Sequence, residues 1–191
     1  MWTLFSIQST TTTTTTKQHV VRVRKFDASN NEWIQMGQDI VTSDDPQDYS
    51  GWSVALNQDG SILAVGAPGS NNTGVVRVWI FASADADNAN DNAANEWQRM
   101  GQDIKGDAPG DEYGYAIALS WTGDIVAIGA AGVNQHKGQT RVWRYESTTN
   151  DDNKEWIQMG QDLQGENKHS GSGNSLALSS DGMIAAVGAY G

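Results

Sequence analysis

The sequence predicts an all-β protein built from repeated antiparallel sheets, and three recurring motifs support this prediction. The first has the form Trp-x-x-Met-Gly-Gln-Asp, the second is similar to Ser-Val-Ala-Leu, and the third is similar to Val-Arg-Val-Trp. Their copies start at Trp33, Trp97 and Trp156, at Ser53, Ala116 and Ser175, and at Val21, Val76 and Thr140, respectively. Each motif returns after roughly 60 residues, which indicates one supersecondary unit stacked on copies of itself.

Four short strands are expected in the unit that spans residues 51–104. They cover 53–56, 61–67, 75–81 and 97–104. An Asp-Gly pair between the first two strands is typical of a tight hairpin. The second strand is almost continuously apolar, which indicates burial on both faces, and alternation in the third places Val76, Val78 and Ile80 on one face. Four antiparallel strands per repeat are typical of a β-propeller blade.

The predicted fold class is therefore a β-propeller-type array of four-stranded antiparallel blades. Residues 51–104 and 114–163 form complete blades, whereas residues 20–40 and 174–191 contain the last two and the first two strands of a blade. Because propellers usually have four to eight blades, we expect a fragment of a larger propeller, and an arc that a partner copy completes or that stays open is the alternative. The two half-blades would leave strand edges and apolar faces uncovered, so we expect the chain to self-associate through them.

Residues 1–19 precede the repeats and are expected to form a disordered tail. This tail contains an unbroken Thr run whose side chains have little to pack against. The first seven residues are apolar but lack a basic segment, so they do not form a convincing signal peptide. No run of about 18 apolar residues occurs, and no transmembrane segment is expected. The chain has no Cys, which excludes disulfides and thiolate metal sites.

The charge of the chain limits its partners. With 12 basic and 23 acidic residues, the net charge is −11 at pH 7. Nucleic acids and anionic membrane surfaces both attract basic proteins. We therefore expect no nucleic-acid partner, and a protein or a glycan is the expected kind of partner.

Three segments of the first complete unit resemble the FG-GAP repeat. They are Gly51–Leu56, Leu63–Gly69 and Gly74–Trp79, and related segments recur in the same order in the rest of the chain. The FG-GAP repeat builds the seven-bladed propeller of integrin α subunits and occurs in bacterial and algal surface proteins. The Trp-x-Gln-x-Gly-Gln-Asp block is similar to that of large algal and marine microbial repeat proteins. The resemblance implies an extracellular or cell-surface location and a role in adhesion.

The resemblance also raises the question of calcium. Calcium-binding FG-GAP blades carry an Asp-x-Asp-x-Asp-Gly loop between their first two strands. The corresponding loops here span residues 57–60, 120–123 and 179–182, and each offers at most one carboxylate. Ca²⁺ takes six to eight oxygen ligands, several of them from carboxylates. No metal and no cofactor are therefore predicted.

Candidate binding residues are acidic side chains in the loops before the innermost strands, together with two tryptophans. The acidic residues are Asp44, Asp48, Asp107, Asp111, Glu112 and Glu166, and the tryptophans are Trp52 and Trp121. In a propeller these loops gather on one face near the axis, where a cation or a basic partner could bind. The two tryptophans are candidates because they do not recur in every unit. A solvated acidic rim and partly buried rings are the competing interpretations.

Other recurring residues are predicted to be structural. The three motif tryptophans are expected to pack between blades. The three motif aspartates, Asp39, Asp103 and Asp162, are expected to accept hydrogen bonds from backbone N–H groups at a turn. Small residues of the second strand, such as Gly66 and Gly129, are expected near the propeller axis, where large side chains do not fit.

The favoured function is a non-catalytic interaction module that presents propeller loops to a protein or glycan partner. No catalytic constellation stands out, so the protein is not expected to be an enzyme. A carbohydrate-active propeller enzyme stays open as an alternative, although hydrolysis needs two carboxylates in different environments at a set separation. A truncated gene product without independent function is the other alternative.

Overall fold

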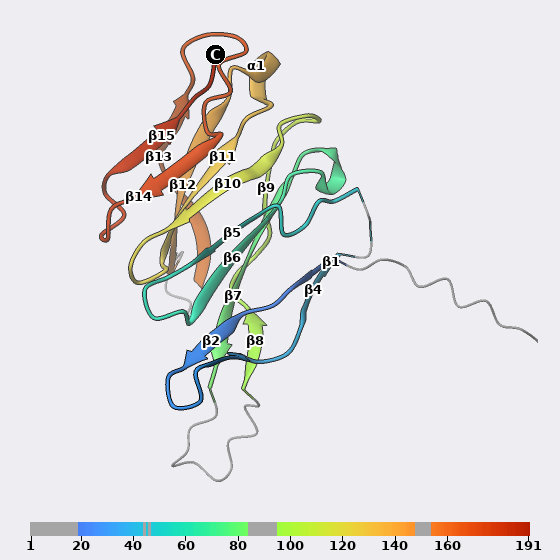
Figure 1. Cartoon of the computed structure of the whole chain (residues 1–191). Coiled ribbons are helices and arrows are strands. Elements are labelled where there is room, and N and C mark those ends of the chain that lie inside the picture. Colours follow the sequence, from blue (N-terminus) through green and yellow to red (C-terminus); the bar gives the residue numbers. More distant parts are fainter. Residues whose placement is uncertain (1–18, 44, 46, 84–94, 148–153) are drawn as a thin grey trace, which may run out of the picture.

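The structure is a computed structural model that describes residues 19–43, 45, 47–83, 95–147 and 154–191. The strands form several antiparallel sheets that follow one another along the chain, and none of these sheets is closed (Figure 1). The prediction of an all-β protein is confirmed. The predicted tail falls almost entirely on residues 1–18, which lie outside the described residues.

Two of the sheets contain four or more strands. The first consists of β5 (Ser53–Leu56), β6 (Ile62–Ala67), β7 (Val75–Ala82) and β8 (Glu96–Arg99), with the short β9 (Ile104–Lys105) also paired to β7. The second consists of β10 (Tyr113–Leu119), β11 (Ile125–Ala130), β12 (Gln139–Ser147) and β13 (Lys154–Gln164). Each sheet therefore contains one copy of all three sequence motifs.

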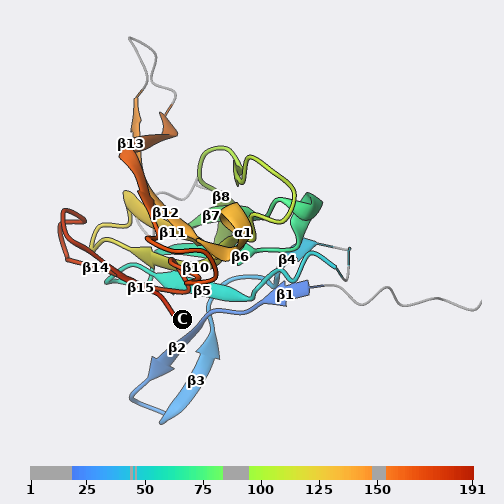
Figure 2. The same ribbon diagram turned by 90° about the horizontal axis from the view of Figure 1, so that it is seen from above.

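Two-stranded sheets lie at both ends of the described chain. On the N-terminal side, β1 (His19–Val21) pairs with β4 (Ile40–Ser43), and β2 (Arg24–Asp27) pairs with β3 (Glu32–Gln35). On the C-terminal side, β14 (Ser175–Leu178) pairs with β15 (Ala185–Gly188). The β2–β3 hairpin projects away from the other strands when the molecule is seen from above (Figure 2).

Consecutive sheets pack through their first two strands. β10 contacts β5 and β6 of the preceding sheet, and β14 contacts β10 and β11 in the same way. A Cβ atom on Gly66 would come within 2.2 Å of the carbonyl oxygen of Gly114, and one on Gly129 within 2.0 Å of the carbonyl oxygen of Gly173. Glycine is required at both positions because the backbone of the next sheet occupies the space of a side chain.

The fourth strand of the first complete unit differs from the expectation. A single strand is predicted for residues 97–104, whereas β8 ends at Arg99 and β9 begins at Ile104. Between them, Gly101 has a φ of +72°, in the left-handed region that favours glycine. Gly37 and Gly160 have φ values of +74° and +67° at the same motif position. A break or irregularity in the fourth strand is therefore part of the motif.

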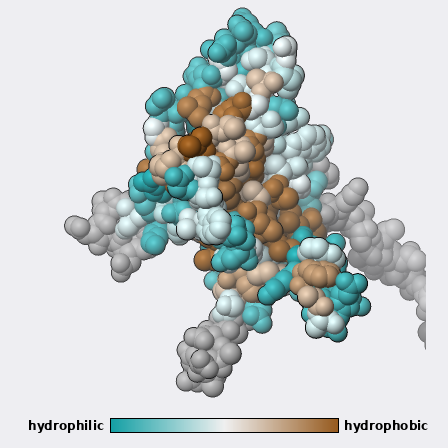
Figure 3. All heavy atoms as spheres, turned by 60° about the vertical axis from the view of Figure 1, so that its left-hand side comes forward, coloured by the Kyte–Doolittle hydropathy of each residue, from teal (hydrophilic) through white to brown (hydrophobic). Residues whose placement is uncertain are grey.

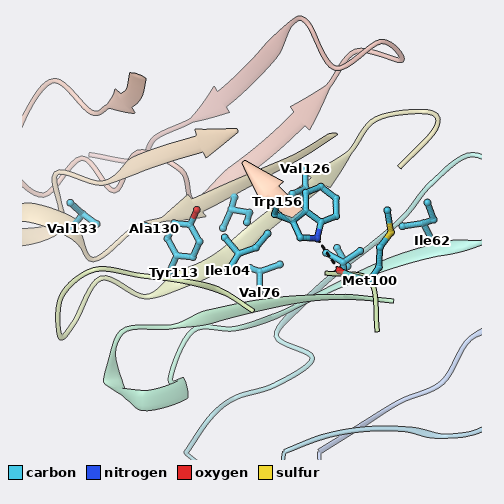
Figure 4. Packing of buried hydrophobic residues seen from close by; sticks show 12 residues of the cluster. Ile62, Val76, Met100, Ile104, Tyr113, Val126, Ala130, Val133 and Trp156 are labelled. Carbon is cyan, nitrogen blue, oxygen red and sulfur yellow. Dashed lines mark hydrogen bonds between the residues drawn. The ribbon is translucent and has the colours of Figure 1, made fainter. Parts of the chain in front are cut away.

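The core lies between consecutive sheets and includes two of the motif tryptophans, of which Figure 4 shows Trp156. Trp97 and Trp156 are only 4% and 2% exposed. The indole Nε1 of Trp97 donates a hydrogen bond to the carbonyl oxygen of Met36 at 2.8 Å, and that of Trp156 donates to Met100 at 2.9 Å. These contacts confirm that both tryptophans pack between sheets.

A glutamine side chain completes each of these contacts. The amide of Gln38 accepts a hydrogen bond from the backbone N–H of Trp97 at 2.8 Å and donates one to its carbonyl oxygen at 2.9 Å. Gln102 makes the same two bonds with Trp156, at 3.0 and 2.8 Å. The amide thus imitates a backbone β-bridge to the next sheet. We call this contact the Gln–Trp junction.

Trp33, the first copy of this tryptophan, lies on the surface of the described chain. It is 63% exposed, so the prediction that it packs between sheets is wrong for this copy. Its ring centroid lies 5.4 Å from that of Phe26. At the other end, Ile184 is 71% exposed. Figure 3 shows hydrophobic residues gathered in a band on one face of the molecule.

Tyr113 is a buried phenol that links stability to alkaline pH. It has no exposed surface, and its Oη accepts a hydrogen bond from Trp143 Nε1 at 2.6 Å. Burial raises the pKa of Tyr113 well above its ordinary value of 10.0. Above about pH 10 the unfolded chain therefore releases the phenol proton, while the folded chain retains it.

We therefore expect the ionisation of Tyr113 to leave the free energy of unfolding unchanged below about pH 10. It should fall by about 1.4 kcal/mol per pH unit above that value. Urea unfolding between about pH 9 and pH 11 measures this slope, with Tyr113→Phe as the control that lacks the phenol. Equal slopes for parent and variant would contradict the expectation.

Helical structure among the described residues is limited to η1 (Ser70–Asn72) and α1 (Val133–His136). Within α1, Asn134 and Gln135 have positive φ, so this segment is a turn rather than a regular helix. No helix in the described ranges combines the length and the apolar character needed to cross a membrane.

Candidate functional site

A pocket of about 450 Å³ lies between the loops that precede β5 and β10. Its lining residues are Tyr49, Trp52, Pro68, Gly69, Asn72, Gly110, Glu112 and Tyr115. The pocket contains two of the predicted binding residues, Trp52 and Glu112, which come from consecutive units of the repeat. Its volume lies within the range of about 300–1,000 Å³ that is usual for small-molecule sites. We call it the aromatic pocket.

Three aromatic side chains, Tyr49, Trp52 and Tyr115, line the pocket. The ring centroid of Trp52 lies 5.4 Å from that of Tyr115 and 6.4 Å from that of Tyr49, with interplanar angles of 51° and 71°. Tyr49 and Trp52 are each 55% exposed. Because more than half of each of these two side chains is exposed, a ligand can reach both rings.

Two residues of the aromatic pocket have unusual backbone conformations. Tyr49 and Glu112 have φ values of +50° and +55°, and the equivalent residue of the next unit is Gly171 with +57°. The repeat therefore requires a left-handed residue here, yet two of its three copies use a residue other than glycine. Such a conformation costs of order 1 kcal/mol and is often found at ligand sites.

The predicted acidic residues do not all reach the pocket. Glu112 lines it, whereas the Asp111 carboxylate accepts hydrogen bonds from the backbone N–H groups of Asp107 and Ala108, at 3.0 and 2.8 Å. The Asp107 side chain pairs with the guanidinium of Arg141. These two carboxylates are thus bound to groups of the protein itself.

The remaining acidic candidates are scattered. Asp48 is buried, with 8% exposure, and its carbonyl oxygen accepts a hydrogen bond from the N–H of Gly69 at 3.1 Å. Glu166 is exposed in the loop after β13. Asp44 lies outside the described residues. A shared acidic cluster is therefore not seen among the candidates that the structure describes.

Trp121 lies at the opposite end of the strands from the aromatic pocket. Trp52 precedes β5 and contacts Tyr115 near the start of β10, whereas Trp121 follows the end of β10. The Trp121 side chain is 54% exposed. Its backbone connects three hairpins, because its carbonyl oxygen accepts from Gln58 N–H and its own N–H donates to Ser180. The two predicted tryptophans therefore do not share a site.

The motif aspartates bind arginine side chains, which corrects the prediction that they accept backbone N–H groups. Two guanidinium nitrogens of Arg22 bind the two carboxylate oxygens of Asp39, at 2.9 and 2.6 Å. Arg141 binds Asp162 in the same way, at 2.9 and 3.2 Å. These bonds lower the pKa of Asp162 below its ordinary value. The Arg141–Asp162 pair connects β12 to β13, whereas Arg22 lies between β1 and β2 and Asp39 lies between β3 and β4.

The carboxylates of the hairpin loops bind groups of their own hairpins. Asp59 Oδ1 accepts hydrogen bonds from the N–H and the hydroxyl of Ser61, at 2.9 and 2.6 Å. Asp181 Oδ1 accepts from the Ser179 hydroxyl at 2.6 Å and from the N–H of Met183 at 3.0 Å. In the described part of the chain, no group of three or more His, Cys, Asp or Glu is placed to hold a metal ion.

Sequence reasoning missed six of the eight lining residues of the aromatic pocket, among them the aromatic and amide side chains of Tyr49, Asn72 and Tyr115. Alignment of the repeats offers a signal for two of them, because Tyr49 aligns with Glu112 and Tyr115 aligns with Trp52. These four residues therefore occupy two positions of the repeat in consecutive copies. Asn72 has no comparable signal, since it enters from the loop between β6 and β7.

The chain matches no family model, and no curated protein matches it.

Proposed function

We propose that the chain folds into FG-GAP-like propeller blades and binds a glycan, without catalysis, in the aromatic pocket. One observation carries this proposal: three aromatic rings, a carboxylate and an amide converge from two consecutive repeats. The C–H faces of a sugar ring are flat and apolar, so they stack on tryptophan and tyrosine. The hydroxyl groups of the sugar would bond to Glu112 and Asn72.

A basic peptide is the second candidate ligand. Aromatic rings attract cations, and Glu112 would pair with a Lys or Arg side chain. The net charge of −11 would also speed the association of a basic partner. Both ligands fit a binding module that displays its loops on a rigid scaffold.

A glycan array followed by calorimetry tests the proposal. The full chain is applied to an array of neutral oligosaccharides, and the strongest binder is titrated into the parent, Trp52→Ala and Glu112→Gln. Trp52→Ala should weaken binding by about 30-fold, as expected for a central aromatic contact. Glu112→Gln should retain glycan binding within about 10-fold, because the amide still bonds to hydroxyls. Trp121→Ala, which is equally exposed but distant, is the matched control.

The outcomes separate the candidates. No binding on the array, or equal affinity of Trp52→Ala and parent, would overturn the glycan proposal. Binding of an oligolysine peptide that Glu112→Gln abolishes would favour the basic peptide instead. Mass spectrometry of the bound oligosaccharide addresses the carbohydrate-active alternative, since cleavage products would show that the pocket is catalytic.

A further inference from the structure

The residues that form the two Gln–Trp junctions also occur at the two ends of the array. One end has the tryptophan and the other end has the acceptor, and the described chain does not join them. In the described chain Trp97 sits on Met36–Gln38 and Trp156 sits on Met100–Gln102. A third tryptophan, Trp33, and a third acceptor, Met159–Gln161, belong to the same motif. The seven residues from Trp33 to Asp39 are identical to those from Trp156 to Asp162.

The third acceptor has the same shape as the two that are occupied. A Cβ atom on Gly37 would lie 2.9 Å from Cδ1 of Trp97, and one on Gly101 would lie 2.8 Å from Cδ1 of Trp156. Gly160 keeps the left-handed backbone of these glycines, but no atom lies within 4 Å of the equivalent point. The surface that would receive an indole ring is therefore formed and open.

The third tryptophan, Trp33, has the same aromatic neighbour as the buried Trp97. Trp33 pairs with Phe26 across β2 and β3, as Trp97 pairs with Phe81 across β7 and β8. The ring centroids in these pairs lie 5.4 and 5.2 Å apart, at interplanar angles of 57° and 58°. The geometry of the exposed pair thus matches that of the buried pair.

The strand edges beside these residues are complementary. In the complete sheets the second strand pairs with the third, with Gly66 opposite Val76 and Gly129 opposite Thr140. In the described chain β15 has only β14 as a neighbour, and the segment that aligns with the third strand, residues 21–24, pairs only with β3 and β4. The same register would place Gly188 opposite Val21 and Ala185 opposite Arg24.

We propose that two copies of this chain associate head to tail, with Trp33 of each copy seated on Met159–Gln161 of the other. Residues 21–24 of one copy then pair with β15 of the other and complete its last sheet. Two complete sheets from each copy and two shared sheets make six four-stranded sheets, within the range of four to eight blades that propellers use. Such a head-to-tail contact can close into a ring of two.

This inference is independent of the aromatic pocket, because the two surfaces share no residue. The repeated internal junction identifies the partner, since a second copy offers the same tryptophan, glycine and glutamine that already fit each other twice. The exposed apolar residues at the ends give such a dimer a driving force. Ile184 is 71% exposed, whereas its equivalents Ile62 and Ile125 are 7% and 3% exposed.

Light scattering of the full chain is the first test. Over about 1 to 100 µM the mass should rise toward twice the 20.6 kDa of one chain, by mass action. Trp33→Ala should weaken the association by at least about 30-fold, whereas Trp121→Ala, with similar exposure, should leave it unchanged. A monomer at all these concentrations, or a Trp33→Ala variant that associates like the parent, would overturn the proposal.

Cysteine cross-linking is the second test, and it reports the register directly. The chain has no Cys, so Arg24→Cys and Ala185→Cys can be introduced singly into separate copies. Directly opposed strand residues have Cβ atoms about 5 Å apart, which allows a disulfide after slight adjustment. Mixing the two variants under mild oxidation should give a cross-linked dimer, while Arg24→Cys mixed with Ser175→Cys should not.

The double variant with both cysteines in one chain distinguishes dimerisation from closure within a chain. A link between two copies supports the proposal. A cross-linked monomer would show that residues 21–24 reach β15 of the same chain, and would overturn it.

Discussion

Trp156→Ala is expected to lower the free energy of unfolding by about 3–5 kcal/mol, the usual cost of removing a large buried aromatic side chain. The Trp156 side chain is 2% exposed and lies in the core between the two complete sheets. Its removal also leaves the carbonyl oxygen of Met100 without the indole N–H that donates to it at 2.9 Å. Urea unfolding followed by circular dichroism measures the change.

Trp33→Ala is the matched control for this prediction. Trp33 occupies the same motif position but is 63% exposed, so its removal should cost less than about 1 kcal/mol. The comparison must be made at a protein concentration low enough to keep the chains apart. Similar losses for the two variants would mean that burial between sheets is not what gives this tryptophan its effect.

Gly129→Ala has the second large expected effect, about 3 kcal/mol, because it forces a methyl group into the packed backbone of the next sheet. The new Cβ would lie 2.0 Å from the carbonyl oxygen of Gly173 and 2.9 Å from its carbon. Gly173 cannot move aside easily, since its N–H donates to the carbonyl oxygen of Gly188 at 3.0 Å. The last sheet should therefore separate from the preceding one.

Gly60→Ala tests whether this loss comes from the close approach or from glycine itself. Gly60 has a φ of +75° in a hairpin loop, and no atom lies within 4 Å of its Cβ position. Only backbone strain should count there, about 1 kcal/mol. The same urea experiment applies, and a loss at Gly60 as large as that at Gly129 would refute the steric explanation.

The sheets were predictable because the first, third and fourth strands each carry a recurring motif, and the second is an almost continuous apolar run. β5 covers the predicted residues 53–56, and β6 begins one residue after the predicted start at Ser61. The break between β8 and β9 was not predictable from hydrophobic patterning. It depends on the left-handed conformation of Gly101, which the periodicity of apolar residues does not reveal.

The candidate site was only partly predictable, for a related reason. Trp52 and Glu112 were identified as single residues, but their proximity depends on how two sheets stack. The ion pairs of the motif aspartates could have been predicted from the sequence. Every unit that contains the Gln-Asp pair also contains the arginine of the Val-Arg-Val motif, and the two strands lie side by side. This joint recurrence indicates a charge pair rather than a turn.

The Gln–Trp junction has a consequence for how such arrays change in evolution. Gln38 and Gln102 bind the backbone N–H and carbonyl of the next tryptophan, groups that almost every residue possesses. The glutamine therefore does not distinguish one neighbouring unit from another. Gene duplication, deletion or circular permutation between units would preserve every such bond, so the number of units is free to vary while the contact between them stays the same.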